Sequence, residues 1–332
     1  MLHVTSYMLY FFMLKLFSGS ANLHLSKEVA KLLNTPLAEA EIVRFGNSEV
    51  KVTVQEDVQD DYCVIIQATS NPTDTHIMEM ALFCDALRRQ EAQKVMGIIP
   101  YFGYAKQDIQ HRPGECVSVN VVIKLFETIG FNKLITLDLH DEGSAGIFTI
   151  PFKNASAFPL LAHKIADFFK NEKVDLNKVA LVSPDQGAVE KVRKFGIEFY
   201  GTEKFNEVVI EKKRDQNVMH KAEPYDLYGD IKGKIAIIVD DMVVSGSTMI
   251  PAINLCLARG ATEVYAAAVH HDFTEGAAER LQNSKLIKFF TTNTIAFKPG
   301  DEFAKMIEYS VAPVIAEELQ TLKNKDKLYP KQ

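Results

Sequence analysis

The stretch of sequence that decides the fold is Ile235-Ala-Ile-Ile-Val-Asp240-Asp241-Met-Val-Val-Ser245-Gly246-Ser247-Thr248. Its leading apolar residues predict a strand, two carboxylates follow, and a turn of small residues leads into a helical run at residues 250–259. A helix N-terminus presents unpaired backbone N–H groups and partial positive charge, both of which stabilise a bound phosphate. The candidates for binding a phosphate group are therefore Ser245, Gly246, Ser247 and Thr248.

Asp240 and Asp241 are expected to lie beside that anion rather than under it. There they can accept hydrogen bonds from sugar hydroxyls or help to hold Mg²⁺, which favours a phosphorylated sugar over ATP phosphates alone. The lysine of a Walker motif is missing, which argues against a P-loop. The alternative is a buried strand and an N-capped helix without a ligand, but such a strand has no use for paired charges at its carboxyl end.

The composition is ordinary for a globular protein, with 332 residues, of which 47% are hydrophobic and 24% charged. This length favours two domains. A formal net charge of −6 and a pI near 5.9 disfavour a nucleic-acid partner, which would require a basic surface. The four cysteines lack metal-ligand spacing, so we expect neither a zinc site nor a disulfide framework, and we predict a reducing, cytoplasmic location.

The first twelve residues, MLHVTSYMLYFF, are apolar but carry no basic segment, and Lys15 soon interrupts the run. We therefore expect neither a signal peptide nor a membrane span. Residues 1–12 are interpreted as an extension of unknown role, and a first strand is expected in the segment MLKLFSG, which begins at Met13.

Short β-branched runs alternate with amphipathic stretches along the chain, which predicts parallel βαβ units with helices on both faces of a sheet. The expected strands are residues 62–67, 95–100, 134–139, 179–182, 235–239, 264–269 and 286–291. The expected helices are residues 75–89, 118–129, 158–170, 188–194 and 248–259. A Pro-containing stretch at residues 150–159 is the expected boundary between two α/β lobes of similar size.

Three other strand ends carry polar side chains. Lys106 and Gln107 follow one strand and could meet the phosphates or base of a nucleotide, although an aromatic core edge is the simpler interpretation of Tyr101, Phe102 and Tyr104. His140 and Asp185 follow two further strands, so acidic strand ends from both lobes are expected to share one cleft that suits a metal-bound polyphosphate or a proton relay.

Two more segments are candidates. The run Ile210-Glu-Lys-Lys-Arg-Asp215 could be solvated surface, but a mobile loop carrying Lys212 and Arg214 could close over the charge that develops in phosphoryl transfer. Arg44-Phe-Gly-Asn-Ser-Glu49 offers an aromatic face and two hydrogen-bonding side chains, which suits base stacking, although a plain turn is the simpler interpretation.

Five segments, in order, resemble the ribose-phosphate diphosphokinases, also called phosphoribosyl pyrophosphate synthetases, and the likeness runs from about residue 13 to residue 322. They are RFGNSE at 44–49, YFGYAKQD at 101–108, DLH at 138–140, SPD at 183–185 and VDDMVVSGST at 239–248. The resemblance implies an α/β fold of two phosphoribosyltransferase-like domains, residues 13–155 and 156–322, each a mainly parallel sheet flanked by helices. Members usually form homo-oligomers, as hexamers built from dimers.

The resemblance also implies the chemistry. The diphosphoryl group of MgATP passes to the anomeric hydroxyl of ribose 5-phosphate, giving phosphoribosyl pyrophosphate and AMP, without nucleic acid or a membrane. Asp240 and Asp241 would hold the ribose hydroxyls, and the turn at 245–248 would hold the 5-phosphate. The residues implied for ATP are Phe45, Asn47 and Glu49, donated across a subunit boundary to Lys106 and Gln107. His140 and Asp185 match positions that bind the Mg²⁺-polyphosphate, and Lys212 and Arg214 match the mobile catalytic loop.

Some positions depart from the family pattern. Lys106 stands where arginine is usual, so a point charge replaces a bidentate fork and weaker ATP binding is expected. Ile109 and Gln110 replace basic residues of the long loop. Glu142 and Lys153 replace a small polar residue and an aspartate in regions that bind regulators in one class, which predicts weak or absent phosphate activation and ADP allostery.

Two other functions remain open at this point. A phosphoribosyltransferase would share the turn at 245–248, but it would need neither Phe45 nor Lys106. A non-catalytic family member that regulates an active partner is the other alternative, and the presence of His140, Asp185 and Lys212 argues against it.

Overall fold

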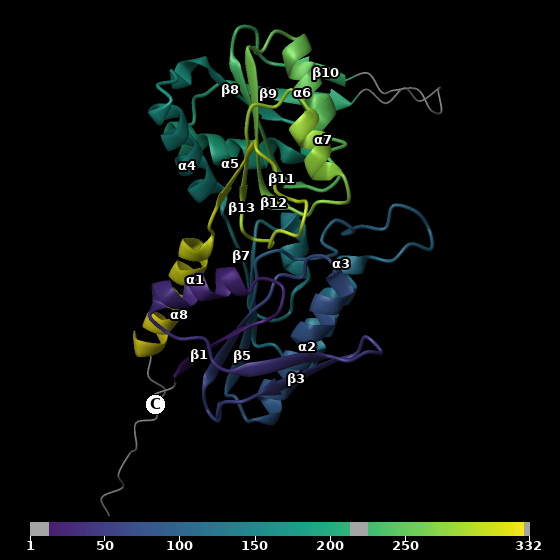
Figure 1. The fold of residues 1–332 in the computed structure, drawn as a ribbon, viewed down its shortest axis with the longest axis vertical. Coiled ribbons are helices and arrows are strands. Elements are labelled where there is room, and N and C mark those ends of the chain that lie inside the picture. Colours follow the sequence, from purple (N-terminus) through teal and green to yellow (C-terminus); the bar gives the residue numbers. More distant parts are fainter. Residues whose placement is uncertain (1–12, 213–224, 329–332) are drawn as a thin grey trace, which may run out of the picture.

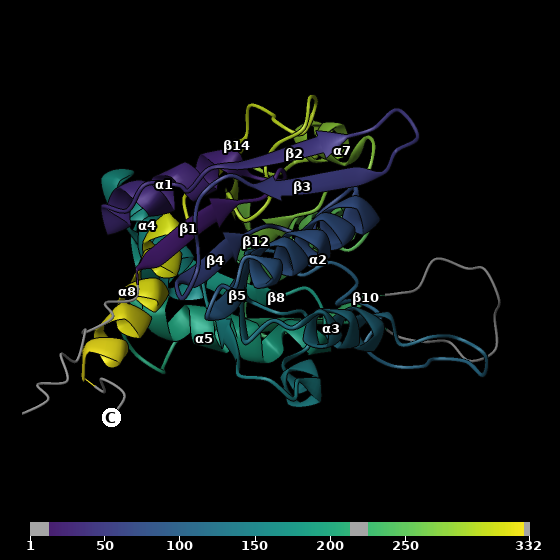
Figure 2. The same ribbon diagram turned by 90° about the horizontal axis from the view of Figure 1, so that it is seen from below.

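The computed structural model describes residues 13–212 and 225–328, which form two α/β lobes stacked along the long axis of the molecule (Figure 1). The first lobe has a five-stranded parallel sheet in the order β1-β4-β5-β6-β7. Its strands are β1 (Leu14–Ser18), β4 (Tyr62–Ile66), β5 (Lys94–Ile99), β6 (Lys133–Leu137) and β7 (Phe152–Ala155). The hairpin of β2 (Ala40–Arg44) and β3 (Val50–Val54) projects past helix α2 (Thr73–Arg89) (Figure 2).

The second lobe has a seven-stranded sheet in the order β10-β9-β8-β11-β12-β13-β14, parallel except for the pair of β9 and β10. Its strands are β8 (Val179–Ser183), β9 (Glu207–Lys212), β10 (Tyr225–Tyr228), β11 (Ile235–Val243), β12 (Glu263–His271), β13 (Phe289–Thr292) and β14 (Met306–Tyr309). The α/β class and the parallel sheets expected from the sequence are confirmed.

Both faces of each sheet are buried, because successive side chains on a strand point to opposite faces. On β4, Val64 packs against one apolar cluster and Ile65 packs against another. On β11, Ile237 and Ile238 divide in the same way between two clusters. The cluster that contains Val64 and Ile237 extends through both lobes, so the two sheets share one core.

Helices cover these faces. In the first lobe, α2 and α3 (Ser118–Ile129) contribute to one cluster, and α1 (Leu23–Leu33) contributes to the other. In the second lobe, α4 (Phe158–Asn171) and α5 (Val189–Tyr200) lie opposite α6 (Met249–Ala258) and α7 (Ala277–Asn283). The C-terminal helix α8 (Ala312–Leu328) returns to pack on α1 of the first lobe (Figure 1).

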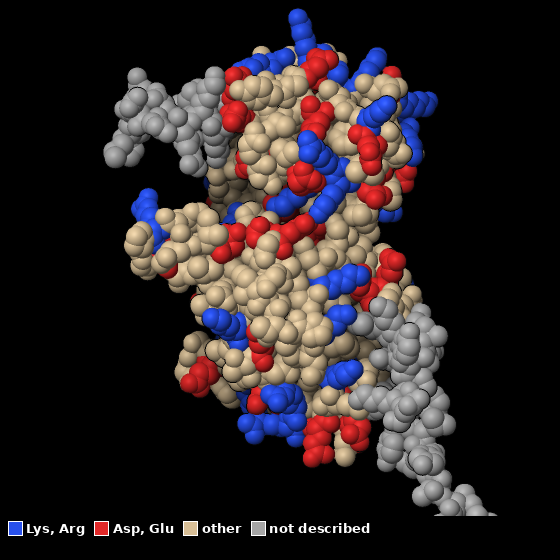
Figure 3. Space-filling view, turned by 180° about the vertical axis from the view of Figure 1, so that it is seen from behind, with Lys and Arg blue, Asp and Glu red and all other residues tan. Residues whose placement is uncertain are grey.

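Some expected boundaries were wrong. Strand β6 ends at Leu137, two residues early, and α5 continues to residue 200 instead of stopping at 194. Strand β11 continues to Val243 rather than ending before the two carboxylates, because its pairing with the long strand β12 extends to His271. Seen from behind, acidic and basic side chains lie next to one another near the junction of the lobes (Figure 3). No helix in the described ranges is long and apolar enough to cross a membrane.

Candidate active site

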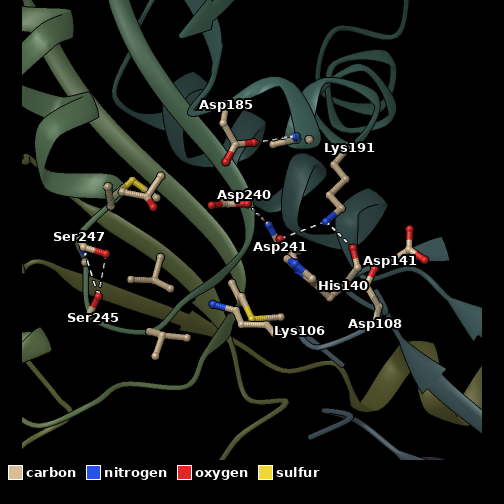
Figure 4. Close-up of a pocket in the computed structure, with 18 residues that line it drawn as sticks. Lys106, Asp108, His140, Asp141, Asp185, Lys191, Asp240, Asp241, Ser245 and Ser247 are labelled. Carbon is tan, nitrogen blue, oxygen red and sulfur yellow. Dashed lines mark hydrogen bonds and ion pairs between the residues drawn. The ribbon is translucent and has the colours of Figure 1, made fainter. Parts of the chain in front are cut away.

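A cleft of about 370 Å³ lies between the two lobes (Figure 4). It brings together most of the residues that the sequence marked as candidates, from segments far apart in the chain. These are Lys106, His140, Asp185, Asp240, Asp241, Ser245, Gly246, Ser247 and Thr248. Asp108, Asp141 and Lys191 also line it, so the cleft holds five carboxylates and two lysines.

The turn at residues 244–248 leads from β11 into α6. Gly246 has φ +76°, in the left-handed region that glycine adopts without strain. The Ser247 N–H donates to Ser245 Oγ at 3.3 Å, and the two serine hydroxyls lie 2.9 Å apart. Helix α6 has no side-chain hydrogen bond at its N-cap, Thr248. The Ile250 N–H donates to the Gly246 carbonyl at 2.9 Å and Pro251 has no N–H, so an anion at this helix end would be met by the amides of the turn rather than by the first turn of the helix.

Arg280 of α7 supports this turn from outside. Its Nη2 and Nε atoms donate to the carbonyl of Ser245 at 2.9 and 3.2 Å. The arginine fixes the position of the turn and adds positive charge close to it. No motif in the sequence indicates Arg280, because the contact joins residues 35 positions apart.

Asp240 and Asp241 lie inside β11, not after it, and they have different surroundings. The Asp241 side chain is 2% exposed, and the Asp240 side chain accepts a hydrogen bond from the Asp241 N–H at 2.9 Å. Burial and the charge of Asp241 raise the pKa of Asp240 well above its usual range. Burial also tends to raise the pKa of Asp241, but hydrogen bonding to His140 and the charge of Lys191 outweigh it and hold that pKa below its usual range.

Both oxygens of Asp241 already have protein partners. His140 Nδ1 lies 2.8 Å from Oδ2, and Lys191 Nζ lies 3.1 Å from Oδ1. Because an ionised carboxylate only accepts hydrogen bonds, His140 must carry its proton on Nδ1, which leaves Nε2 for a ligand. The contact on Asp240 is to Oδ1, so its Oδ2 is the carboxylate oxygen more open to a sugar hydroxyl, while Asp241 has only its remaining lone pairs to offer.

Asp185 could take part in binding a metal. Its Oδ1 atom accepts from the Ala188 N–H at 3.1 Å, which leaves Oδ2 for a ligand. No cluster of three or more metal-binding side chains occurs in the described part of the chain. This donor set fits Mg²⁺ bound through a carboxylate together with substrate phosphates and water, and it does not fit an all-protein metal cage.

Asp138 has a structural position instead. It is buried, it accepts hydrogen bonds from Ser156 Oγ and the Ala157 N–H at 2.6 Å each, and burial raises its pKa to about 7. The carboxylate thus ties the end of β6 to the start of α4 and does not line the cleft.

Only some of the residues expected to bind ATP line the cleft. Lys106 lines the cleft, whereas Gln107 accepts a hydrogen bond from Ser118 Oγ and does not line it. The turn of the projecting hairpin, which follows β2, carries Phe45, Asn47 and Glu49 and lies outside the cleft. The Phe45 residue is 47% exposed.

The aromatic residues near Lys106 have two locations. Phe102 belongs to the apolar core. Tyr101 and Tyr104 line a second cavity of about 520 Å³ that shares Lys106 and Val244 with the cleft.

The two candidates for a mobile catalytic loop cannot be placed at the cleft. Lys212 is the last residue of β9, where its backbone pairs with Tyr225. Arg214 lies outside the described residues.

Lys191 also lines the cleft, and like Arg280 it lies outside the motifs that mark the other site residues. Its position did carry a signal: Lys191 and the buried Phe195 are four residues apart on α5, so they share one helix face. A lysine on an apolar helix face needs a partner, and here the partner is Asp241.

Comparison with known proteins shows the family of the chain. Residues 14–130 match the N-terminal domain of ribose phosphate pyrophosphokinase, and residues 200–329 match the phosphoribosyl synthetase-associated domain. The chain is 35% identical over 305 residues to a ribose-phosphate pyrophosphokinase of Bacillus caldolyticus. The aligned residues cover 92% of this chain and 93% of the relative. A Fusobacterium nucleatum protein of the same name is 36% identical, with coverage of 93% and 95%.

A solved structure has the same fold. The crystal structure of phosphoribosylpyrophosphate synthetase from Mycobacterium smegmatis superposes with a TM-score of 0.86 at 29% identity, covering 94% of this chain and 99% of that one. Fold and site together define an α/β protein of two phosphoribosyltransferase-like domains with the cleft between them. The chain belongs to the ribose-phosphate pyrophosphokinase family and is a transferase of the kinase type, in nucleotide biosynthesis.

Proposed function

We propose that the protein transfers the diphosphoryl group of MgATP to ribose 5-phosphate, giving phosphoribosyl pyrophosphate and AMP. The anomeric oxygen attacks the β-phosphorus, a new P–O bond forms there, and the bond from the β-phosphorus to the oxygen bridging the α-phosphate breaks. That oxygen leaves with AMP, and the anomeric hydroxyl loses its proton.

The observation that carries this proposal is the joining of an anion-binding turn and acidic strand ends in one cleft. The amides at residues 245–248 suit the 5-phosphate, and Asp240, beside them in the same cleft, suits the ribose hydroxyls. Asp185 and His140 line the same cleft and would face the phosphates of the nucleotide. Lys106 supplies a positive charge between this cleft and the second cavity.

The protein's own groups would mainly orient and neutralise, as in other phosphoryl transfers. His140 Nε2 is a candidate to take the anomeric proton, because Nδ1 is occupied by Asp241. Lys212 and Arg214 would place positive charge over the developing negative charge. Mg²⁺, held by Asp185 together with substrate oxygens, would neutralise charge on the transferring phosphates. If His140 Nε2 held the ion instead, it would not be the group that takes the proton, because Nδ1 is occupied by Asp241.

Residues for adenine are proposed to come from a second subunit. Phe45 is exposed at the end of a projecting hairpin and lies outside its own cleft, which suits a role in a neighbouring site. Asn47 and Glu49 on the same turn would bind the base. The protein would then act as a homo-oligomer built from dimers, in a reducing cytoplasm that keeps its four cysteines as thiols.

Phosphorus NMR tests the proposal. Purified protein with MgATP should produce AMP and the anomeric diphosphate signal when ribose 5-phosphate is added, and neither product without it. Conversion of phosphoribosyl pyrophosphate and a free base into a nucleotide, without any use of ATP, would instead indicate a phosphoribosyltransferase. Absence of both reactions in folded protein would favour the non-catalytic alternative.

A further inference from the structure

Lys191 lines the cleft and joins the two lobes there. It belongs to α5 of the second lobe, and its side chain is 17% exposed. Its Nζ atom donates to the carbonyl of His140, which follows β6 of the first lobe, at 2.9 Å. The same ammonium lies 3.1 Å from Asp241 Oδ1 of the second lobe.

The three residues form a closed ring of contacts. Lys191 contacts Asp241 through one carboxylate oxygen, His140 Nδ1 contacts the other oxygen at 2.8 Å, and the His140 carbonyl returns to Lys191 (Figure 4). His140 is thus held at its backbone and at its ring. A ring that crosses the lobe boundary fixes the imidazole relative to Asp240, which follows Val239 on the same strand as Asp241.

Charge gives Lys191 a second role. Five carboxylates line the cleft against two lysines, and Lys191 is the lysine that contacts one of these carboxylates within 4 Å. Without it, a doubly charged phosphate ester would enter a cleft with five carboxylates and one lysine. The ammonium has three donors and uses two on protein atoms, so it acts mainly through His140 and Asp241.

We propose that Lys191 is a positioning residue that holds the His140–Asp241 pair across the lobe boundary and thereby prepares the cleft for ribose 5-phosphate. This inference rests on the proposed function. It assigns Lys191 no bond to the reacting atoms. It differs from a purely structural role because it predicts an effect on ligand affinity in protein that is fully folded.

Lys194 provides a matched control. It lies on the same helix and contacts Glu142, which also follows β6 in the first lobe. Both side chains are more than half exposed, at 54% and 64%, and neither contacts Asp241 or His140. Lys194→Met therefore removes a lysine and a contact between the lobes while leaving the ring of contacts intact.

The experiment compares K191M, K191Q, K191R and K194M. Calorimetry measures ribose 5-phosphate binding without ATP or Mg²⁺, steady-state assays give kcat and KM, and circular dichroism checks folding. Removing a positive charge from an acidic cleft that binds a doubly charged phosphate, and releasing His140, predicts that K191M and K191Q bind ribose 5-phosphate at least about 30-fold more weakly. K191R should recover to within about 5-fold of the parent, because it keeps the charge and the donors, and K194M should bind as the parent does.

Folded K191M and K191Q with the affinity of K194M would overturn the inference. Failure of both variants to fold would overturn it as well, because Lys191 would then maintain the fold rather than the site. If the parent and K194M make no AMP from ATP and ribose 5-phosphate, the proposed function fails. If they are active and K191M matches them in affinity and turnover, only the role of Lys191 fails.

Discussion

The Asp241→Asn substitution tests the buried ion pair at the centre of the site. Asp241 is 2% exposed, and Lys191 is 17% exposed, so little water can replace the lost carboxylate charge. The amide of asparagine can still accept a hydrogen bond from His140, but it cannot neutralise the lysine. The substitution leaves a mostly buried ammonium without its counter-ion.

The magnitude follows from that burial. Removing one partner of a buried ion pair costs about 3–5 kcal/mol, and the partial exposure of Lys191 places this pair at the lower end. The substitution also removes the repulsion between Asp241 and Asp240, which offsets only about 1 kcal/mol of that cost. The offset is small because the raised pKa of Asp240 already reduces its negative charge. We expect a net loss of about 2–3 kcal/mol in the free energy of unfolding. That loss lowers the melting temperature by roughly 5–10 °C for a unit of about 150–250 residues.

Urea unfolding and thermal melting at pH 7 measure this loss. The matched control is Asp85→Asn, which breaks a 2.7 Å pair with Arg89 on the outside of α2, where both side chains are exposed. Solvent screens that exposed pair, so its loss should change the free energy of unfolding very little. If Asp241→Asn costs less than about 1 kcal/mol, similar to the control, then the pair is not effectively buried and the reasoning fails.

Three further predictions concern other parts of the chain. Gly246→Ala places a side chain at φ +76°, with its Cβ 3.3 Å from Ile250, so the affinity for ribose 5-phosphate should fall about 10-fold. The control is Gly233→Ala, at φ +74° in open space, which should leave that affinity unchanged. Equal effects of the two substitutions would refute the role of the turn. Burial lowers the pKa of His271 to about 3, so as the pH falls below 6.5 this histidine is protonated in the unfolded chain but not in the folded protein. The free energy of unfolding should therefore drop by about 2 kcal/mol between pH 7 and pH 5 through this residue. Urea unfolding of His271→Leu at the two pH values should show that this part of the pH dependence is gone. Titration with inorganic phosphate should leave activity nearly constant, since Glu142 and Lys153 are already ion-paired within the chain, and strong activation would contradict this.

The central strands were predictable because they are short apolar runs, buried on both faces. Strands β7, β10 and β14 lie at the ends of their sheets, and their sequences carry no such signal. The extension of β11 through the two carboxylates could not be predicted either, because it depends on pairing of Asp240 with Ala268 of β12. Propensity alone would end that strand at the first charge.

In the site, too, the parts that are local in sequence are predictable and the parts that depend on distant contacts are not. The residues of the turn at 245–248 are adjacent in the sequence, so the sequence alone predicts them. The ring that His140, Asp241 and Lys191 form depends on contacts between the lobes and leaves only a weak local signal. Arg280 reaches the turn from α7, and nothing near it in the sequence indicates that contact.

The most direct measurement is calorimetric titration of the purified protein with ribose 5-phosphate and, separately, with ribose. If the amides of the turn at 245–248 bind the phosphate, ribose 5-phosphate should bind measurably and ribose should bind at least about 100-fold more weakly. Equal affinities for the two sugars, or no binding of ribose 5-phosphate to folded protein in the presence of Mg²⁺, would contradict the account.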